Sequence, residues 1–155
     1  MAETRIHPVT GKVLHRDVRT QVVSFGSMTR AVATPGWYPD DDSDSLHTGT
    51  DLAHSEEAFR DLKAAYAAHV REVRKRLNLT QEEAGRIIGG GRRAFQKYES
   101  GATPPSDAAV GLIELLSRHP EEVEFLRSLR QSADGSQTAS RDFIQDHARD
   151  AEVDV

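Results

Sequence analysis

Five polar side chains between residues 81 and 97 have the types and spacing needed to bind duplex DNA. Arg92, Arg93, Gln96 and Lys97 follow one another at helical spacing with no acidic residue among them, and Gln81 starts the segment before. Arginine can bind guanine O6 and N7, and glutamine can pair with adenine; each good pair contributes roughly 1–3 kcal/mol to base discrimination. Gln81, beside free backbone N–H groups, suits a phosphate, and Lys97 suits either phosphate or base.

Two short helices must position this set. Thr80 is typical of an N-cap and predicts a helix over 81–88, and the glycines at 89–91 supply a sharp turn. A second helix is predicted over 92–99, ending at Gly101, with Tyr98 and Glu99 interpreted as structural residues that close its end. Small residues at Ala84 and Gly85 let the two axes cross closely. The pattern predicts a helix-turn-helix.

The remaining elements define the fold class. Residues 12–14, 18–25 and 28–34 read as strands, with a hairpin turn at Gly26-Ser27 and a break at Pro35-Gly36. Ser55 is a plausible N-cap for one long helix, or two abutting ones, over 56–77, and further helices are predicted near 107–117 and 121–130. The expected fold is α+β: a small N-terminal antiparallel β-hairpin or sheet domain followed by a five-helix helix-turn-helix domain. The helix predicted over 56–77 carries an apolar stripe at steps of three and four residues, which consists of Phe59, Leu62, Tyr66, Val70, Val73 and Leu77.

Charge is distributed unevenly along the predicted domains. The whole chain carries −5, whereas the segment 55–101 has ten Lys/Arg against seven Asp/Glu, a net of +3. A polyanion should therefore dock on the middle third. We expect three parts: a β-rich partner-binding domain over 1–54, a DNA-binding and dimerisation domain over 55–131, and a flexible acidic tail over 132–155 with at most a fragile helix around Phe143-Ile144.

Composition excludes several kinds of chemistry. With no cysteine, disulfides and thiolate ligands or nucleophiles are impossible. No apolar run approaches the roughly 20 residues that span a bilayer, and the start of the chain lacks a secretory core, so we expect a cytoplasmic protein. We predict no catalytic residue, no cofactor and no metal site. Two weak metal patterns occur in the sequence: a partial calcium-loop match at Asp40, Asp42, Asp44 and Asp51, and four scattered histidines, His7, His15, His47 and His54.

The segment from Thr80 to Gly101 resembles the Cro/repressor-type (XRE) helix-turn-helix in its Thr-Gln start, its small residues at Ala84-Gly85, Gly89 after the first helix and its Tyr98-Glu99-x-Gly101 ending. A wider resemblance, over roughly residues 7–130, is to the MqsA-type antitoxins, also called YgiT-type zinc-finger antitoxins. It adds Gly36-Trp37-Tyr38 and the downstream run 115–121.

This resemblance implies a zinc-bound N-terminal domain that docks a toxin, and a C-terminal domain that dimerises and represses its own operon. The chain departs from the family pattern at the zinc ligands. Where relatives have Cys-Pro-x-Cys it has His7-Pro8-Val9-Thr10, and where they have Tyr-Cys-x-x-Cys it has residues 38–42, Tyr-Pro-Asp-Asp-Asp. Either the sheet holds without metal or the domain serves another partner.

Three functions remain open on the sequence alone. The first is an antitoxin that binds a protein toxin and represses its own operon; the second is a free-standing regulator whose N-terminal domain senses a ligand or protein; the third is a small metal-dependent enzyme. In the first two, a homodimer should bind a palindromic operator with half-sites about 34 Å apart. Two interpretations of the positively charged run Arg71, Arg74, Lys75 and Arg76 also remain: it contacts phosphate, or it forms a solvated helix face. The expected dimer contacts are Leu112, Leu116 and Phe125.

Overall fold

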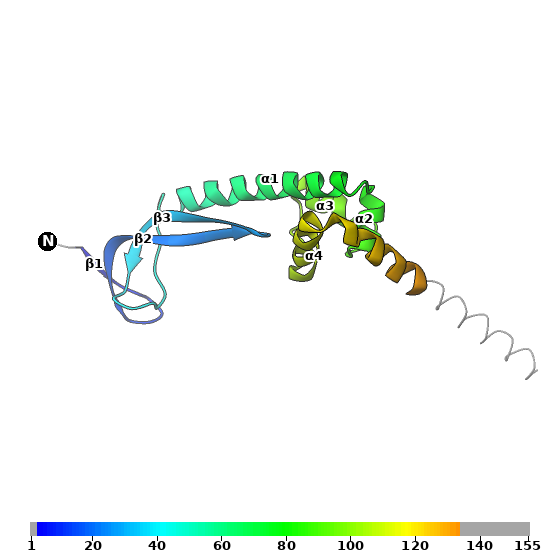
Figure 1. The fold of residues 1–155 in the computed structure, drawn as a ribbon. Helices are drawn as coiled ribbons and strands as arrows, with labels where there is room; N and C mark the ends of the chain where they lie inside the picture. The colour runs from blue at the N-terminus through cyan, green and yellow to red at the C-terminus, as the bar shows by residue number, and fades with distance from the viewer. Residues whose placement is uncertain (1–2, 134–155) are drawn as a thin grey trace, which may run out of the picture. The chain divides into compact units, whose positions relative to one another are not determined.

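The computed structural model describes residues 3–133, so most of the predicted acidic tail, including Phe143-Ile144, lies outside the described residues. The chain divides into two compact units, and the boundary falls between His69 and Val70. Within the described part, a three-stranded antiparallel sheet is followed by five α-helical segments, and the predicted α+β class is confirmed. Figure 1 shows the order of the elements along the chain.

The N-terminal unit is built on a long hairpin. The strands are β1 (Thr4–Ile6), β2 (Val13–Phe25) and β3 (Met28–Tyr38), in the order β1-β2-β3. Phe25 pairs with Met28 across a two-residue loop, as predicted, and Gly26 at φ 59° supplies the left-handed backbone that such a tight turn requires. A Cβ at Gly26 would lie 2.5 Å from the ring of Tyr66, so the helix that follows packs directly on the turn.

The predicted break at Pro35-Gly36 is wrong, because β3 continues through both residues to Tyr38. Trp37 directs its N–H and C=O away from β2 and pairs them with Leu46. Since these groups alternate sides along a strand, Pro35 also faces the outer edge, and its missing N–H removes no bond to β2. An edge position therefore tolerates a proline that the interior of a sheet would not.

Helix α1 (Ala53–Arg76) begins two residues before Ser55, so the prediction of Ser55 as its N-cap is wrong. The turn before it is closed by bonds from Asp51 N–H to Thr48 and from Ala53 N–H to Thr50. Asp51 is itself anchored by Arg16, whose guanidinium donates two bonds of 2.8 and 2.6 Å to the carboxylate. A fixed turn, rather than a serine cap, starts this helix.

The apolar stripe of α1 is buried as predicted, except that Phe59 is 43% exposed. Leu62 and Tyr66 belong to the core of the N-terminal unit, whereas Val70, Val73 and Leu77 belong to the C-terminal unit. The other helices are α2 (Gln81–Ile87), α3 (Ala94–Ser100), α4 (Asp107–Arg118), the 3₁₀ turn η1 (Pro120–Glu122) and a helical run over 123–133.

Candidate nucleic-acid interface

The start of α2 is fixed by a reciprocal cap. The backbone N–H of Glu83 donates to the Thr80 hydroxyl at 3.1 Å, and the Thr80 N–H donates to the Glu83 carboxylate at 3.1 Å. This capping box was partly predicted from Thr80. The same N–H bond from Thr80 lowers the pKa of Glu83, with smaller contributions from the Thr80 hydroxyl and Arg127. Gln81, the first residue of α2, is half-buried beside the first helical N–H groups.

The turn between α2 and α3 requires glycine at its crossing points. Gly89, Gly90 and Gly91 have φ of 127°, 94° and 93°, values that other residues rarely adopt. A Cβ on Gly85 would lie 2.1 Å from the carbonyl oxygen of Gly91, so the turn rests on the backbone of α2. The predicted close crossing at Gly85 is thus present.

Helix α3 presents one buried and one exposed face. Ala94 and Phe95 are buried, whereas Gln96 and Lys97 are exposed, and Arg93 is exposed at the N-cap. The Phe95 ring packs edge-on against Tyr98 at 5.4 Å between centroids. The helix ends at Gly101, as predicted, with φ 76°. Gln96 and Lys97 therefore face outward from the interior of the C-terminal unit.

A buried ion pair joins α3 to α1. Arg74 Nε and Nη2 donate to the two Glu99 carboxylate oxygens at 2.9 and 2.8 Å, and Arg74 Nη1 donates to the Leu79 carbonyl at 2.9 Å. Only 13% of the Arg74 side chain and 6% of the Glu99 side chain are exposed. Arg74 thus holds α3 in place and is not available for phosphate, and the structural role predicted for Glu99 has a specific partner.

The structure also brings an acidic residue to the predicted basic set. Arg92 Nε lies 3.3 Å from Glu82 Oε1, and Arg86 lies 3.7 Å from the same oxygen. The sequence interpretation considered only acids within the second helix and so missed Glu82; its i,i+4 spacing to Arg86 was the available signal. Over residues 3–133, no ion pair involves Arg93 or Lys97. These two cations are therefore the most available of the set.

Two further arginines connect the last helical run to α2. Arg127 lies 3.4 Å from the Glu83 carboxylate, and Arg130 Nε donates to the Ile87 carbonyl at 3.3 Å. Both contacts bridge more than 40 residues of sequence. Sequence spacing carries no signal for such pairs. Arg127 contacts α2 through the capping-box residue Glu83, and Arg130 contacts the last residue of α2.

An apolar groove of about 480 Å³ lies between α4 and the run 123–133. Phe125, one of the predicted dimer contacts, is 61% exposed at this groove, and Leu115 is 51% exposed. Leu116 is only 1% exposed, so it belongs to the core and forms the base of the groove rather than an outer contact. Leu112 lines the same groove.

The residues at the positions where the resemblance implies zinc ligands do not fit a zinc ion. His7 is buried, and its Nδ1 accepts the N–H groups of Val9 and Thr10 at 3.1 and 3.2 Å, which closes the first loop. Across the part of the chain that the structure describes, no three histidine, aspartate or glutamate side chains gather as a metal site. With no cysteine in the sequence, the thiolate donors of structural zinc fingers are missing.

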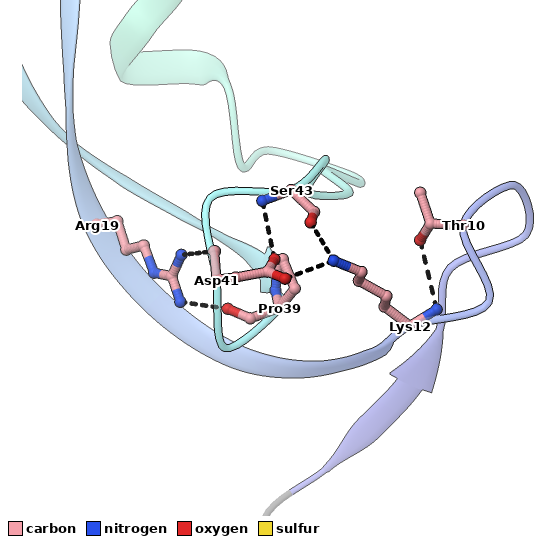
Figure 2. A network of polar contacts seen from close by, with 6 residues as sticks. All are labelled: Thr10, Lys12, Arg19, Pro39, Asp41 and Ser43. Carbon is pink, nitrogen blue, oxygen red and sulfur yellow. Dashed lines mark hydrogen bonds and ion pairs between the residues drawn. The ribbon is translucent and has the colours of Figure 1, made fainter.

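Polar contacts join Lys12 and Arg19 to the loop that contains Pro39, Asp41 and Ser43 (Figure 2). Lys12 Nζ contacts the Asp41 carboxylate and the Ser43 hydroxyl, while Arg19 donates to the carbonyls of Pro39 and Asp41. Hydrogen bonds from Lys12 and Ser43 hold the pKa of Asp41 well below its usual range. We call Lys12, Arg19, Asp41 and Ser43 the loop clip. The loop clip joins these segments through ion pairs and hydrogen bonds, whereas a shared metal would join them by coordination.

The scattered histidines and aspartates have separate roles. His47 lies between the Ser45 hydroxyl at 3.0 Å and the Pro35 carbonyl at 2.9 Å, and His15 lies 3.7 Å from Asp40. The Asp51 carboxylate is occupied by Arg16, whose hydrogen bonds hold the pKa of Asp51 well below its usual range.

Among the helices of residues 3–133, none is long and apolar enough to cross a membrane.

The fold and the site define an α+β protein whose C-terminal unit presents a short helix, with Arg93 and Lys97 exposed, packed across a glycine turn. A family model described as "Antitoxin component of bacterial toxin-antitoxin system, MqsA" matches residues 40–127. Because that match covers more than half of the chain, the protein belongs to the MqsA antitoxin family.

A curated relative agrees with this assignment. The chain is similar to the protein named Antitoxin MqsA from Escherichia coli (strain K12), with 45% identity over 56 residues. The aligned segment covers 36% of this chain and 43% of the relative, so the similarity spans less than half of either protein.

Proposed function

We propose that this protein is the antitoxin of a type II toxin–antitoxin pair, which binds its toxin through the N-terminal unit and represses its own operon through α3. The family assignment supports the general class. The observation that carries DNA binding is the exposed face of Arg93, Gln96 and Lys97, on a helix that the buried Arg74–Glu99 pair holds in place. The proposed role involves no catalysis.

In this proposal, α3 enters the major groove. Arg93, at the N-terminal end, reaches guanine or an adjacent phosphate, and Gln96 pairs with adenine. Gln81 and the first N–H groups of α2 bind a backbone phosphate and set the register. Arg92 contributes less than Arg93, because Glu82 competes for its guanidinium. Lys97 adds a salt-dependent phosphate or base contact.

A monomer with one such helix reads too few bases for useful specificity, so we propose a two-fold homodimer on a palindromic operator. The apolar groove between α4 and 123–133 supports this, because its exposed Leu115 and Phe125 offer surface that a second copy could cover. The free-standing regulator remains the alternative function. It is favoured by the loop clip, which departs from the zinc-bound arrangement that the resemblance implies.

Gel-shift titration with the DNA upstream of the protein's own gene tests the DNA-binding role. Arg93→Ala should weaken binding and relax base preference, whereas Gln81→Ala should weaken binding evenly across sequences. Each loss is expected to be about tenfold, the equivalent of roughly 1.4 kcal/mol. Arg118→Ala removes the same charge from an exposed position at the end of α4 and serves as control. Unchanged affinity in both variants would exclude α3 as the interface. Copurification with the product of a neighbouring toxin gene tests the antitoxin role separately.

A further inference from the structure

The outer edge of β3 is covered along only half of its length. Trp37 exchanges hydrogen bonds of 2.8 and 2.9 Å with Leu46 on this edge. Next along the strand, the Pro35 carbonyl lies 2.9 Å from His47 Nδ1, which must donate because a carbonyl only accepts. Pro35 itself has no N–H to offer. The half of β3 near Tyr38 is therefore closed to another strand.

The other half is open. The β2–β3 register is continuous from Phe25↔Met28 to His15↔Tyr38, so the alternation that turns Trp37 outward also turns Ala31 and Ala33 outward. In the part of the chain that the structure describes, no hydrogen bond outside the β2–β3 ladder reaches the backbone of either alanine. Both alanines are exposed, and a methyl side chain leaves the backbone accessible. Unpaired N–H and C=O groups in a row are a template for strand addition.

A groove of about 390 Å³ runs beside this open edge. Residues 30–33 form one wall, and His54, Glu57, Ala58 and Asp61 of α1 form the other. Every one of these residues belongs to the N-terminal unit. An extended segment lying in the groove would thus meet backbone hydrogen-bonding groups on one side and helix side chains on the other.

The charge of the groove selects its occupant. Arg30 Nη1 lies 3.3 Å from the Asp61 carboxylate and offsets that charge. Glu57 is exposed, and it forms no ion pair within residues 3–133, so the groove carries an unbalanced negative charge. The acidic tail of this chain and the same groove of a second copy would both be repelled. A segment that carries lysine or arginine is the complementary occupant.

We propose that an extended, basic segment of the toxin pairs with β3 at Ala31 and Ala33 and directs a lysine or arginine toward Glu57. This inference rests on the proposed antitoxin function and names the surface that would serve it. The backbone bonds supply affinity, and Glu57 supplies selectivity for the basic segment. Arg30 and Val32, which bond to β2, take no part in the pairing.

Amide hydrogen exchange on the full chain, alone and with the purified product of the neighbouring toxin gene, tests the pairing. The Ala31 and Ala33 amides should exchange rapidly in the free protein and become protected in the complex. The Arg30 and Val32 amides, already bonded to β2, should be protected in both samples and serve as internal controls. A complex that leaves Ala31 and Ala33 unprotected would overturn the edge assignment while leaving the antitoxin function intact. Failure to form any complex would overturn both.

Two matched pairs of variants make the test quantitative. Ala33→Pro removes the edge N–H at a position like that of Pro35, and Ala33→Ser keeps it. Glu57→Lys reverses the groove charge, and Glu56→Lys makes the same change on the neighbouring exposed residue, outside the groove. Ala33→Pro and Glu57→Lys should each weaken toxin binding about tenfold, with the controls close to wild type. Circular dichroism checks that each variant is folded. Protection of the edge by self-association, seen in sedimentation without toxin, would contradict the proposed occupant.

Discussion

Within residues 3–133, each compact unit contains one bidentate arginine–carboxylate pair, and the two pairs differ in the burial of the arginine. Arg74 is 13% exposed in the C-terminal unit, whereas Arg16 is 41% exposed in the N-terminal unit; both carboxylates, Glu99 and Asp51, are 6% exposed. The first pair joins two helices in the interior. The second anchors a surface turn, alongside the exposed loop clip. The arginine of the helical unit is therefore shielded from water, whereas the arginine of the sheet unit remains partly solvated.

The strongest test of this contrast is Glu99→Gln. Removing the carboxylate charge leaves Arg74 buried without its partner, which should cost about 3–5 kcal/mol of unfolding free energy and release α3. Chemical denaturation followed by circular dichroism measures the loss, and DNA binding should fall with it. Asp51→Asn, made in the same way, should cost less because water can solvate Arg16. An equal or larger effect at Asp51 would reverse the comparison between the units.

The second test concerns packing rather than charge. Gly85→Ala places a methyl group 2.1 Å from the Gly91 carbonyl oxygen, a backbone atom that cannot move away cheaply. We expect a loss of about 1–3 kcal/mol in thermal or chemical unfolding. Gly111→Ala is the matched control, because within the described residues no atom other than those of its chain neighbours and the nearby backbone of α4 lies within 4 Å of the new Cβ. There alanine should stabilise the helix by roughly 0.5–1 kcal/mol. Losses of similar size at both positions would show that the crossing is looser than described.

The sequence predicted the α2–α3 region well because its signals are local. Thr80 as a cap and Gly101 as an end act within a few residues, and the hairpin turn at Gly26-Ser27 is equally local. The contacts that orient the site are long-range. Arg74 and Glu99 are 25 residues apart, and Lys12 and Asp41 are 29 apart, so no spacing rule pairs them.

The errors have the same origin. The break expected at Pro35-Gly36 failed because the position of a strand at the edge of a sheet is a property of the folded topology. Leu116 was expected at a dimer surface, but a helical stripe does not say which of its apolar residues the next helix covers. Glu82 was missed because the glycine turn brings it back toward Arg92. Tertiary contacts, not local preferences, decided each of these cases.

The smallest expected effect tests the exposed character of the N-terminal unit. Lys12→Met removes the main contact that lowers the pKa of Asp41, so that pKa should rise toward its ordinary value of about 4. A carboxyl group with a lowered pKa stabilises the folded state above the unfolded pKa, and this contribution is lost as pH falls through the folded pKa. Wild type should therefore be slightly more stable than Lys12→Met at neutral pH, and the difference should vanish in strong acid.

Fluorescence of Trp37, the only tryptophan, measures this difference because the residue is buried in the N-terminal unit. Lys63→Met, in the same unit but outside the loop clip, is the control and should leave the pH profile unchanged. Since the loops are joined by charge rather than by coordination, a chelator should not alter unfolding of either protein, whereas added salt should narrow the gap between them. A chelator that destabilised the wild-type unit would show that a metal, and not the clip, holds these loops together.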